Sequence, residues 1–181
     1  MHFTETRLAG VWIVESDVFA DERGWFARAW APEPFAARGL ETTFVQASLS
    51  SNRRRATIRG LHYQTAPFEE VKLIRAVRGA VHDITVDLRP HSPTYLQWVG
   101  VDLTADNRRM IYIPRGCAHG YQTLTDDADV FYFVSAPYSP AHQRGIRWND
   151  PAVKVEWPLG PPASLSDRDG QFPDFQTAGP R

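Results

Sequence analysis

The segment Ile58-Arg-Gly-Leu-His-Tyr-Gln64 indicates a β-strand, because β-branched, aliphatic and aromatic residues surround a single glycine. Side chains of a strand alternate between two faces. The expected faces are Ile58, Gly60, His62 and Gln64 on one side and Arg59, Leu61 and Tyr63 on the other. An imidazole gains and loses a proton near neutral pH, so an inward-facing His62 is a candidate proton-transfer group. The alternative is a core histidine satisfied by a hydrogen bond, which is the commoner role of a lone histidine.

Similar runs recur along the chain, and turn residues separate them. The expected strands cover residues 42–49, 58–63, 71–77, 81–88, 95–103, 110–113, 120–124 and 130–135. Short strands at this spacing predict an antiparallel sandwich or barrel. A jelly roll of the cupin type is the natural closure, so we expect a mostly β fold, a cupin-like antiparallel jelly-roll barrel with a few short helices.

The two ends of the chain differ from this pattern. Residues 11–14 and 25–30 are expected to form two strands joined through a turn at 21–24. Prolines before residues 35–38 and a glycine just after them indicate a short helix. Residues 148–181 are proline-rich without periodicity, so we expect loops and short helical turns over the barrel. A chain of this length is expected to form one domain over residues 1–181.

Composition narrows the possible partners and compartments. The 181 residues include 20 Lys plus Arg and 21 Asp plus Glu, so the overall charge calls for neither nucleic acid nor an acidic membrane surface. Cys117 is the single cysteine, which excludes an intrachain disulfide and fits a reducing compartment. The apolar run at 8–14 is too short to span a bilayer. We therefore expect a soluble, cytoplasmic protein.

Polar side chains share strand faces with apolar ones. Lys72 falls on the face of Ile74, and Tyr132 falls on the face of Val130. A third such face carries Asp83, Thr85 and Asp87. Taken alone, each of these faces is more consistent with the solvent-exposed side of a half-buried sheet. Together with the candidate strand histidine, they predict a polar barrel interior, which is how small barrels form ligand sites.

The segment Pro114-Arg-Gly-Cys-Ala-His119-Gly120 resembles the second cupin motif, whose histidine often binds a metal. The first cupin motif normally supplies His-x-His and a glutamate, whereas this chain has His62-Tyr-Gln64. A tight metal site usually needs three or more protein ligands. We therefore expect no metal, with His119 as a hydrogen-bonding group in the barrel interior.

Six segments of the chain form a recognisable set. They are Arg59-Gly-Leu-His-Tyr-Gln64, Lys72-Leu-Ile-Arg75, Arg78-Gly79, Pro93-Thr94 with Gln97-Trp-Val-Gly-Val101, Ile113-Pro-Arg-Gly-Cys-Ala-His-Gly120 and Gly145-Ile-Arg-Trp-Asn-Asp-Pro151. Together they resemble the dTDP-4-dehydrorhamnose 3,5-epimerase family over residues 19–169, and the combination is highly specific. The resemblance implies inversion of C3, C5 or both in a nucleotide-diphosphate 4-keto-6-deoxy sugar, without metal or coenzyme.

Four residues match the catalytic positions of that family. The reaction must remove a proton beside a carbonyl, stabilise the enolate and return a proton to the other face of the sugar. The resemblance implies that His62 is the base and Tyr132 the acid on the opposite face. It also implies that Lys72 stabilises the enolate oxygen, and that Asp169 orients the histidine and favours its charged form.

Five further residues match substrate contacts. Arg23 and Arg59 correspond to arginines that hold the diphosphate, a role suited to a permanently charged guanidinium. Gln46 corresponds to a nucleotide contact, His119 to a sugar contact, and Tyr138 to a tyrosine whose placement affects how far epimerisation proceeds. Family members are homodimers that exchange N-terminal strands, so the strands within residues 1–30 are expected to be exchanged and Arg23 to serve the partner's site. Exposure at the surface is the alternative for either arginine.

Two departures from the family pattern fall at the nucleotide end of the site. Gln46-Ala-Ser-Leu-Ser50 replaces the common Gln-Asp-Asn-His-Ser, and Arg28 stands where glutamate is common. A substrate linked to CDP, GDP or UDP instead of dTDP is therefore an open alternative, and so is inversion at only one carbon. So are a metal-dependent cupin enzyme using His62 and His119, a 3,4-ketoisomerase with the same pocket, and a sugar-nucleotide-binding module without catalysis.

Overall fold

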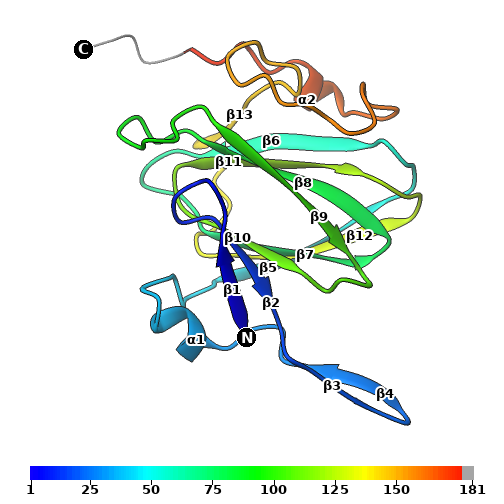
Figure 1. Ribbon diagram of the computed structural model, residues 1–181. Coiled ribbons are helices and arrows are strands. Elements are labelled where there is room, and N and C mark those ends of the chain that lie inside the picture. The colour runs from blue at the N-terminus through cyan, green and yellow to red at the C-terminus, as the bar shows by residue number, and fades with distance from the viewer. Residues whose placement is uncertain (177–181) are drawn as a thin grey trace.

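The computed structural model describes residues 1–176, and most of its regular structure lies in two antiparallel sheets (Figure 1). In spatial order, the first sheet consists of β1 (His2–Glu5), β2 (Trp12–Glu15), β10 (Met110–Ile113), β7 (Lys72–Arg78), β12 (Ala128–Val134) and β5 (Gln46–Asn52). The second consists of β13 (Gln143–Gly145), β6 (Ile58–Gln64), β11 (Cys117–Thr123), β8 (Ala80–Asp87) and β9 (Trp98–Thr104). The prediction of a mostly β, cupin-like jelly roll is confirmed.

Three apolar clusters hold these layers together. The first lies between the two sheets and includes Ile74 and Val130 from one and Val101 from the other. The second packs the outer face of the five-stranded sheet against the C-terminal segment, where Trp157 is buried. The third joins the six-stranded sheet to α1 (Pro32–Ala36) through the fully buried Phe35. The outer faces of both sheets are therefore covered. The space between the sheets holds both apolar and polar side chains.

The N-terminal strands differ in part from expectation. The turn at 21–24 joins β3 (Val18–Asp21) to β4 (Gly24–Ala27), and this hairpin projects away from the barrel (Figure 1). Residues 11–14 were expected to lead into that turn, but β2 instead pairs with β1 and β10 in the six-stranded sheet. The expectation was wrong because Val14 is fully buried against the core, so tertiary packing overrides the local hairpin signal.

The two short helices lie in the segments where short helices were expected, although α1 spans Pro32–Ala36 and the prediction was 35–38. Helix α1 begins at proline and is followed by Gly39 in the left-handed region, with φ +67°. Helix α2 (Asp167–Gly170) lies in the otherwise irregular C-terminal segment, and the hydroxyl of Ser166 accepts a hydrogen bond from the amide of Asp169. No helix within residues 1–176 has the length and apolar character needed to cross a membrane.

Strand β6 departs from simple alternation at Gly60. Its pairing with β11 changes register between His119 opposite His62 and Tyr121 opposite Arg59, so β6 carries one extra residue there. Gly60 has φ +115°, and a Cβ at this position would lie 2.7 Å from the Cα of Gly120, so only glycine fits. The bulge brings Arg59 and His62 to the same cavity.

The predicted faces of this strand were therefore wrong at its beginning. Ile58 and Leu61 were assigned to opposite faces, yet both are buried in the cluster beneath the C-terminal segment. Arg59 was placed on the face opposite His62, yet both side chains line the cavity between the sheets. Alternation counts residues and cannot detect a bulge, because the extra residue appears only when the partner strand is known.

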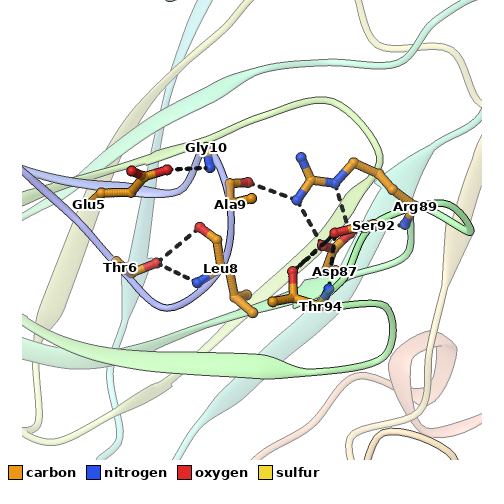
Figure 2. A network of polar contacts seen from close by, with 9 residues as sticks. All are labelled: Glu5, Thr6, Leu8, Ala9, Gly10, Asp87, Arg89, Ser92 and Thr94. Atoms are coloured by element: carbon orange, nitrogen blue, oxygen red, sulfur yellow. Dashed lines mark hydrogen bonds and ion pairs between the residues drawn. The ribbon is translucent and has the colours of Figure 1, made fainter.

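A buried carboxylate connects the β8–β9 connection to the N-terminal turn (Figure 2). Asp87 accepts hydrogen bonds from the guanidinium of Arg89 at 2.7 and 2.8 Å and from the hydroxyls of Ser92 and Thr94 at 2.5 and 2.7 Å. Arg89 also donates to the carbonyl of Ala9 at 2.8 Å. Burial raises the pKa of Asp87, but these donors outweigh it and lower the pKa to about 2. Asp87 therefore serves the fold, whereas it was expected among the polar groups of the barrel interior.

Candidate active site

A cavity of about 430 Å³ lies between the two sheets. Its lining is mostly polar and aromatic and consists of Gln46, Ser50, Arg59, His62, Tyr63, Gln64, Glu70, Lys72, His119, Tyr121, Tyr132, Val134, Tyr138, Gln143 and Arg168. Three of these side chains are arginine or lysine, and one is a carboxylate. The cavity therefore suits a ligand that carries negative charge.

His62 and Asp169 form a hydrogen-bonded pair at this cavity. The Nε2 atom of His62 lies 2.8 Å from Oδ1 of Asp169, and the amide of Gly60 donates to Oδ2 at 3.0 Å. Burial raises the pKa of Asp169, but the bonds from His62 and Gly60 outweigh it, so the net pKa is below its ordinary value. An ionised Asp169 accepts a hydrogen bond from the N–H at Nε2, so the lone pair of the neutral ring is on Nδ1. The pair therefore has the geometry of an oriented base.

Lys72 belongs to a second polar cluster in the cavity wall. Its Nζ atom lies 3.1 Å from Oε1 of Glu70, and the two side chains are 11% and 13% exposed. The amide nitrogen of Gln64 donates to the other carboxylate oxygen at 2.8 Å. The expected interior lysine is thus present, and its charge has a carboxylate partner.

Tyr132 lines the same cavity from the six-stranded sheet, whereas His62 reaches it from the five-stranded sheet. Tyr132 pairs with Ile74 on β7 and Ser48 on β5, and it contacts the apolar cluster between the sheets. The predicted inward face of β12 is therefore confirmed. A ligand in the cavity lies between an imidazole on one wall and a phenol on the other.

His119 is the direct strand neighbour of His62 and also lines the cavity. Its Nε2 atom lies 2.7 Å from Oδ2 of the fully buried Asp83. Burial lowers the pKa of His119 below its ordinary value, although Asp83 opposes this effect. His119 is therefore a neutral imidazole, which can form a hydrogen bond with a sugar oxygen and adds no positive charge to the cavity.

The expected nucleotide contacts lie at the same cavity. Arg59 donates from Nε to Asn52 at 2.7 Å, which fixes the guanidinium beside the cavity. Gln46 donates to the hydroxyl of Ser48 at 3.2 Å, so the position of the first departure from the family pattern contacts a cavity residue. Tyr138 is 52% exposed and lines the cavity too.

Arg23 is the one predicted site residue that lies away from this cavity in the same chain. It sits on the projecting β3–β4 hairpin, its side chain is 85% exposed, and it pairs with Asp21 at 2.5 Å. The same hairpin exposes Phe19, Trp25 and Phe26 at 66%, 53% and 63%. A protruding element with three exposed aromatic side chains is typical of a protein interface.

Several cavity residues were not predicted from the sequence. They are Ser50, Tyr63, Glu70, Tyr121, Val134, Gln143 and Arg168. Strand alternation could have found Glu70, which lies two residues before Lys72, and Tyr121, which lies two residues after His119. Gln143 and Arg168 gave no such signal, because β13 and α2 are short and approach the cavity only in the folded chain.

Binding of a metal ion would require several donor side chains to converge in the cavity. Within residues 1–176, no three His, Cys, Asp or Glu side chains come together in a geometry that could hold one. The Nε2 atoms of His62 and His119 each face a carboxylate. This arrangement fits proton transfer and hydrogen bonding by imidazole.

Comparisons with known proteins agree with the site. The dTDP-4-dehydrorhamnose 3,5-epimerase family model matches residues 5–177. The dTDP-4-dehydrorhamnose 3,5-epimerase of Shigella flexneri is 42% identical over 170 residues, or 93% of each chain. The enzyme of that name from Bacillus anthracis, solved with TDP and PPi bound, has a TM-score of 0.92 and 38% identity and covers 96% of this chain and 99% of its own. ChmJ of Streptomyces bikiniensis, a 3'-monoepimerase solved with dTDP-quinovose, has a TM-score of 0.86 and 32% identity over 93% of this chain and 85% of its own. The chain therefore belongs to the dTDP-4-dehydrorhamnose 3,5-epimerase family of isomerases.

Proposed function

We propose that the protein inverts the carbons beside the ketone of a dTDP-linked 4-keto-6-deoxy sugar by proton transfer through an enolate. The observation that carries this proposal is the placement of His62 and Tyr132 on opposite walls of one cavity that also holds Lys72. Inversion requires that a proton leave one face of the sugar ring and return to the other. Two proton-transfer groups on opposite walls meet that requirement without a coenzyme.

His62 removes the proton in this mechanism. Its Nδ1 atom carries the lone pair, because Nε2 faces the carboxylate of Asp169 at 2.8 Å. When Nδ1 takes the proton, the imidazolium lies beside an ionised carboxylate that stabilises its charge. Asp169 stays ionised because its pKa is below the ordinary value.

Lys72 stabilises the negative charge that appears on the keto oxygen. An ammonium has three N–H donors, and its contact with Glu70 is an ion pair at 3.1 Å. These donors can bind the oxygen as it becomes an enolate. A donor fixed in advance within a largely buried site contributes most in the transition state, where the charge develops.

Tyr132 returns a proton to the carbon from the opposite side. The phenol lines the cavity across from the imidazole, so the new C–H bond forms on the other face of the ring. His119, as a neutral imidazole held by Asp83, binds a sugar oxygen. The sugar is thereby held while its configuration changes.

The diphosphate and nucleotide occupy the part of the cavity near Arg59, Gln46 and Tyr138. Support comes from the guanidinium of Arg59, which is fixed by Asn52, and from the TDP and PPi held by the related Bacillus anthracis enzyme. Neither Ser48 nor Arg28 belongs to the cavity lining of this chain, and the cationic lining suits a diphosphate. Relatives named 3,5-epimerases and a relative named a 3'-monoepimerase share this fold, so the proposal covers inversion at C3, C5 or both.

A homodimer completes the site in this proposal. The exposed aromatic residues of the β3–β4 hairpin need a covering surface, and a second copy of the chain supplies one. The strands within residues 1–30 then cross to the partner, which brings Arg23 to the partner's diphosphate. The reducing cytoplasm is the proposed compartment, consistent with one buried cysteine, Cys117.

Incubation with dTDP-, CDP-, GDP- and UDP-linked 4-keto sugars in D2O, followed by NMR of the products, tests the proposal. We expect deuterium at C3, C5 or both with the dTDP sugar, and no exchange with His62→Ala. Ketone migration from C4 to C3 would support a 3,4-ketoisomerase instead, and binding without exchange would support a binding module. Loss of activity on dialysis against EDTA, restored by iron or manganese, would support a metal-dependent cupin enzyme.

A further inference from the structure

Glu70 occupies a position in the cavity wall that the reaction described above does not use. Both of its carboxylate oxygens are engaged, Oε1 with the ammonium of Lys72 at 3.1 Å and Oε2 with the amide nitrogen of Gln64 at 2.8 Å. Among residues 1–176, Glu70 is the one carboxylate side chain in the cavity lining. A carboxylate that adjoins the ammonium of the proton-transfer site has a direct influence on where that ammonium lies.

The burial of the pair makes this contact consequential. The side chains of Lys72 and Glu70 are 11% and 13% exposed, so water offers little alternative solvation for either charge. Lysine carries its charge on four flexible carbons, and its ammonium has no fixed direction of its own. The attraction of the Glu70 carboxylate therefore determines where in the cavity the ammonium of Lys72 lies.

Gln64 in turn fixes Glu70. Its side chain is buried, and its amide nitrogen lies within hydrogen-bond distance of the carbonyls of Phe68 and Pro137, at 3.0 and 3.2 Å. Its carbonyl oxygen accepts from the amide of Ser139 at 2.7 Å. Gln64 thus links the Glu70 carboxylate to the backbone of two segments, one at Phe68 and one at 137–139. Both carboxylate oxygens are therefore held by protein groups.

Resting on the proposed epimerase function, we propose that Glu70 is a positioning residue that directs the ammonium of Lys72 toward the keto oxygen of the substrate. Glu70 does not touch the substrate in this role, and it acts only through Lys72. Its contribution is confined to the step in which the oxygen becomes negative, because that is when the direction of the ammonium matters most. Removing Glu70 therefore lowers turnover and leaves substrate affinity nearly unchanged.

The test is a double-mutant cycle on the full-length enzyme with a dTDP-4-keto-6-deoxy sugar in D2O. Glu70→Gln is made in the wild-type and in the Lys72→Met background, and kcat and KM for exchange are measured by NMR. In the wild-type background we expect kcat to fall about ten- to hundred-fold, the range that a misdirected catalytic group produces, with KM changed less than about two-fold. In the Lys72→Met background the same substitution is expected to change kcat by less than about two-fold.

Glu69→Gln is the matched control, because it removes the same charge from the neighbouring, exposed residue. We expect it to leave kcat and KM unchanged. If Glu70→Gln fails to fold, as judged by circular dichroism, Glu70→Asp replaces it. Aspartate keeps the charge but withdraws the carboxylate by one carbon, so we expect a several-fold loss of kcat with unchanged KM.

Two results would overturn the role of Glu70. One is normal kcat in Glu70→Gln, and the other is an equal loss in both backgrounds, since the effect would then not pass through Lys72. A wild-type enzyme that exchanges no substrate proton would instead refute the epimerase function itself. The two failures are therefore separable in one set of measurements.

Discussion

His62 and Asp169 are 107 residues apart in the chain, and their side chains are 2.8 Å apart in the folded protein. The aspartate reaches the histidine from α2, a helix of four residues in the irregular C-terminal segment. The same carboxylate accepts the amide of Gly60 from the bulge that turns the histidine toward the cavity. The C-terminal segment thus contributes to the proposed active site and also covers the barrel.

Asp169→Asn is expected to lower the rate of substrate C–H exchange by about 100-fold or more. The neutral amide can donate a hydrogen bond to Nε2, which favours the wrong tautomer of His62, and it does not stabilise the positive charge of the imidazolium. Proton exchange in D2O followed by NMR measures the change. Asp167→Asn, an exposed carboxylate on the same helix, serves as the control and should exchange at the wild-type rate. Unimpaired exchange in Asp169→Asn would remove the aspartate from the mechanism.

Tyr132→Phe is expected to separate proton removal from inversion. His62 remains in place, so deuterium should still enter the substrate with retained configuration, while inverted product falls by roughly 10²–10⁴-fold. NMR distinguishes the two products by the configuration at the labelled carbon. Tyr95→Phe, which lies outside the cavity lining, controls for loss of a phenol. Equal amounts of inverted product in Tyr132→Phe and the wild type would contradict the assignment of the acid.

Lys72→Met is expected to reduce exchange and inversion together by roughly 10²–10³-fold, because the donor to the developing enolate is lost. The chain contains only one other lysine, the exposed Lys154, so Lys154→Met is a matched control with the same change of side chain. Steady-state kinetics on the dTDP sugar provides the comparison. The prediction fails if both variants behave alike.

Asp87→Asn is expected to reduce the free energy of unfolding by about 2 kcal/mol at neutral pH, as judged from the lowered carboxyl pKa. The pKa of Asp87 is about 2 in the folded protein against an ordinary value of 3.8, so its contribution is complete above about pH 4 and is lost as the pH falls toward 2. Urea unfolding at pH 7 and pH 3 measures both effects. The variant should lose less stability than the wild type between these pH values.

Asp106→Asn, an exposed turn residue, is the control for that measurement. It should unfold like the wild type at both pH values. An Asp87→Asn protein with wild-type stability at pH 7 would show that the contacts of Asp87 in Figure 2 contribute little to the fold.

Mixed dimers test whether Arg23 serves the partner's site. Arg23→Ala and His62→Ala homodimers are each expected to be nearly inactive. Unfolding and refolding an equimolar mixture should restore about a quarter of wild-type activity, since half of the dimers are mixed and each contains one complete site. Size-exclusion chromatography confirms the dimer in each sample. No recovery in a mixture that is dimeric would place Arg23 outside the partner's site.

Much of the fold was predictable from local residues. The β-branched and aromatic runs located the barrel strands within a few residues, and proline and glycine located α1, because these signals depend on neighbours in sequence. Strands β1, β3 and β13 were missed. Each has only three or four residues, so its pairing partner decides its structure more than its composition does.

By itself, the sequence determined the residue types that the chemistry needs and, through strand alternation, that Lys72 and Tyr132 face inward. Only the tertiary structure decided that Arg59 joins His62 in the cavity, because the bulge at Gly60 depends on the close approach of Gly120 from β11. It also decided that Glu70 pairs with Lys72 and that Arg23 lies outside its own cavity. These relationships depend on contacts between distant segments, and the periodicity of a single strand carries no information about them.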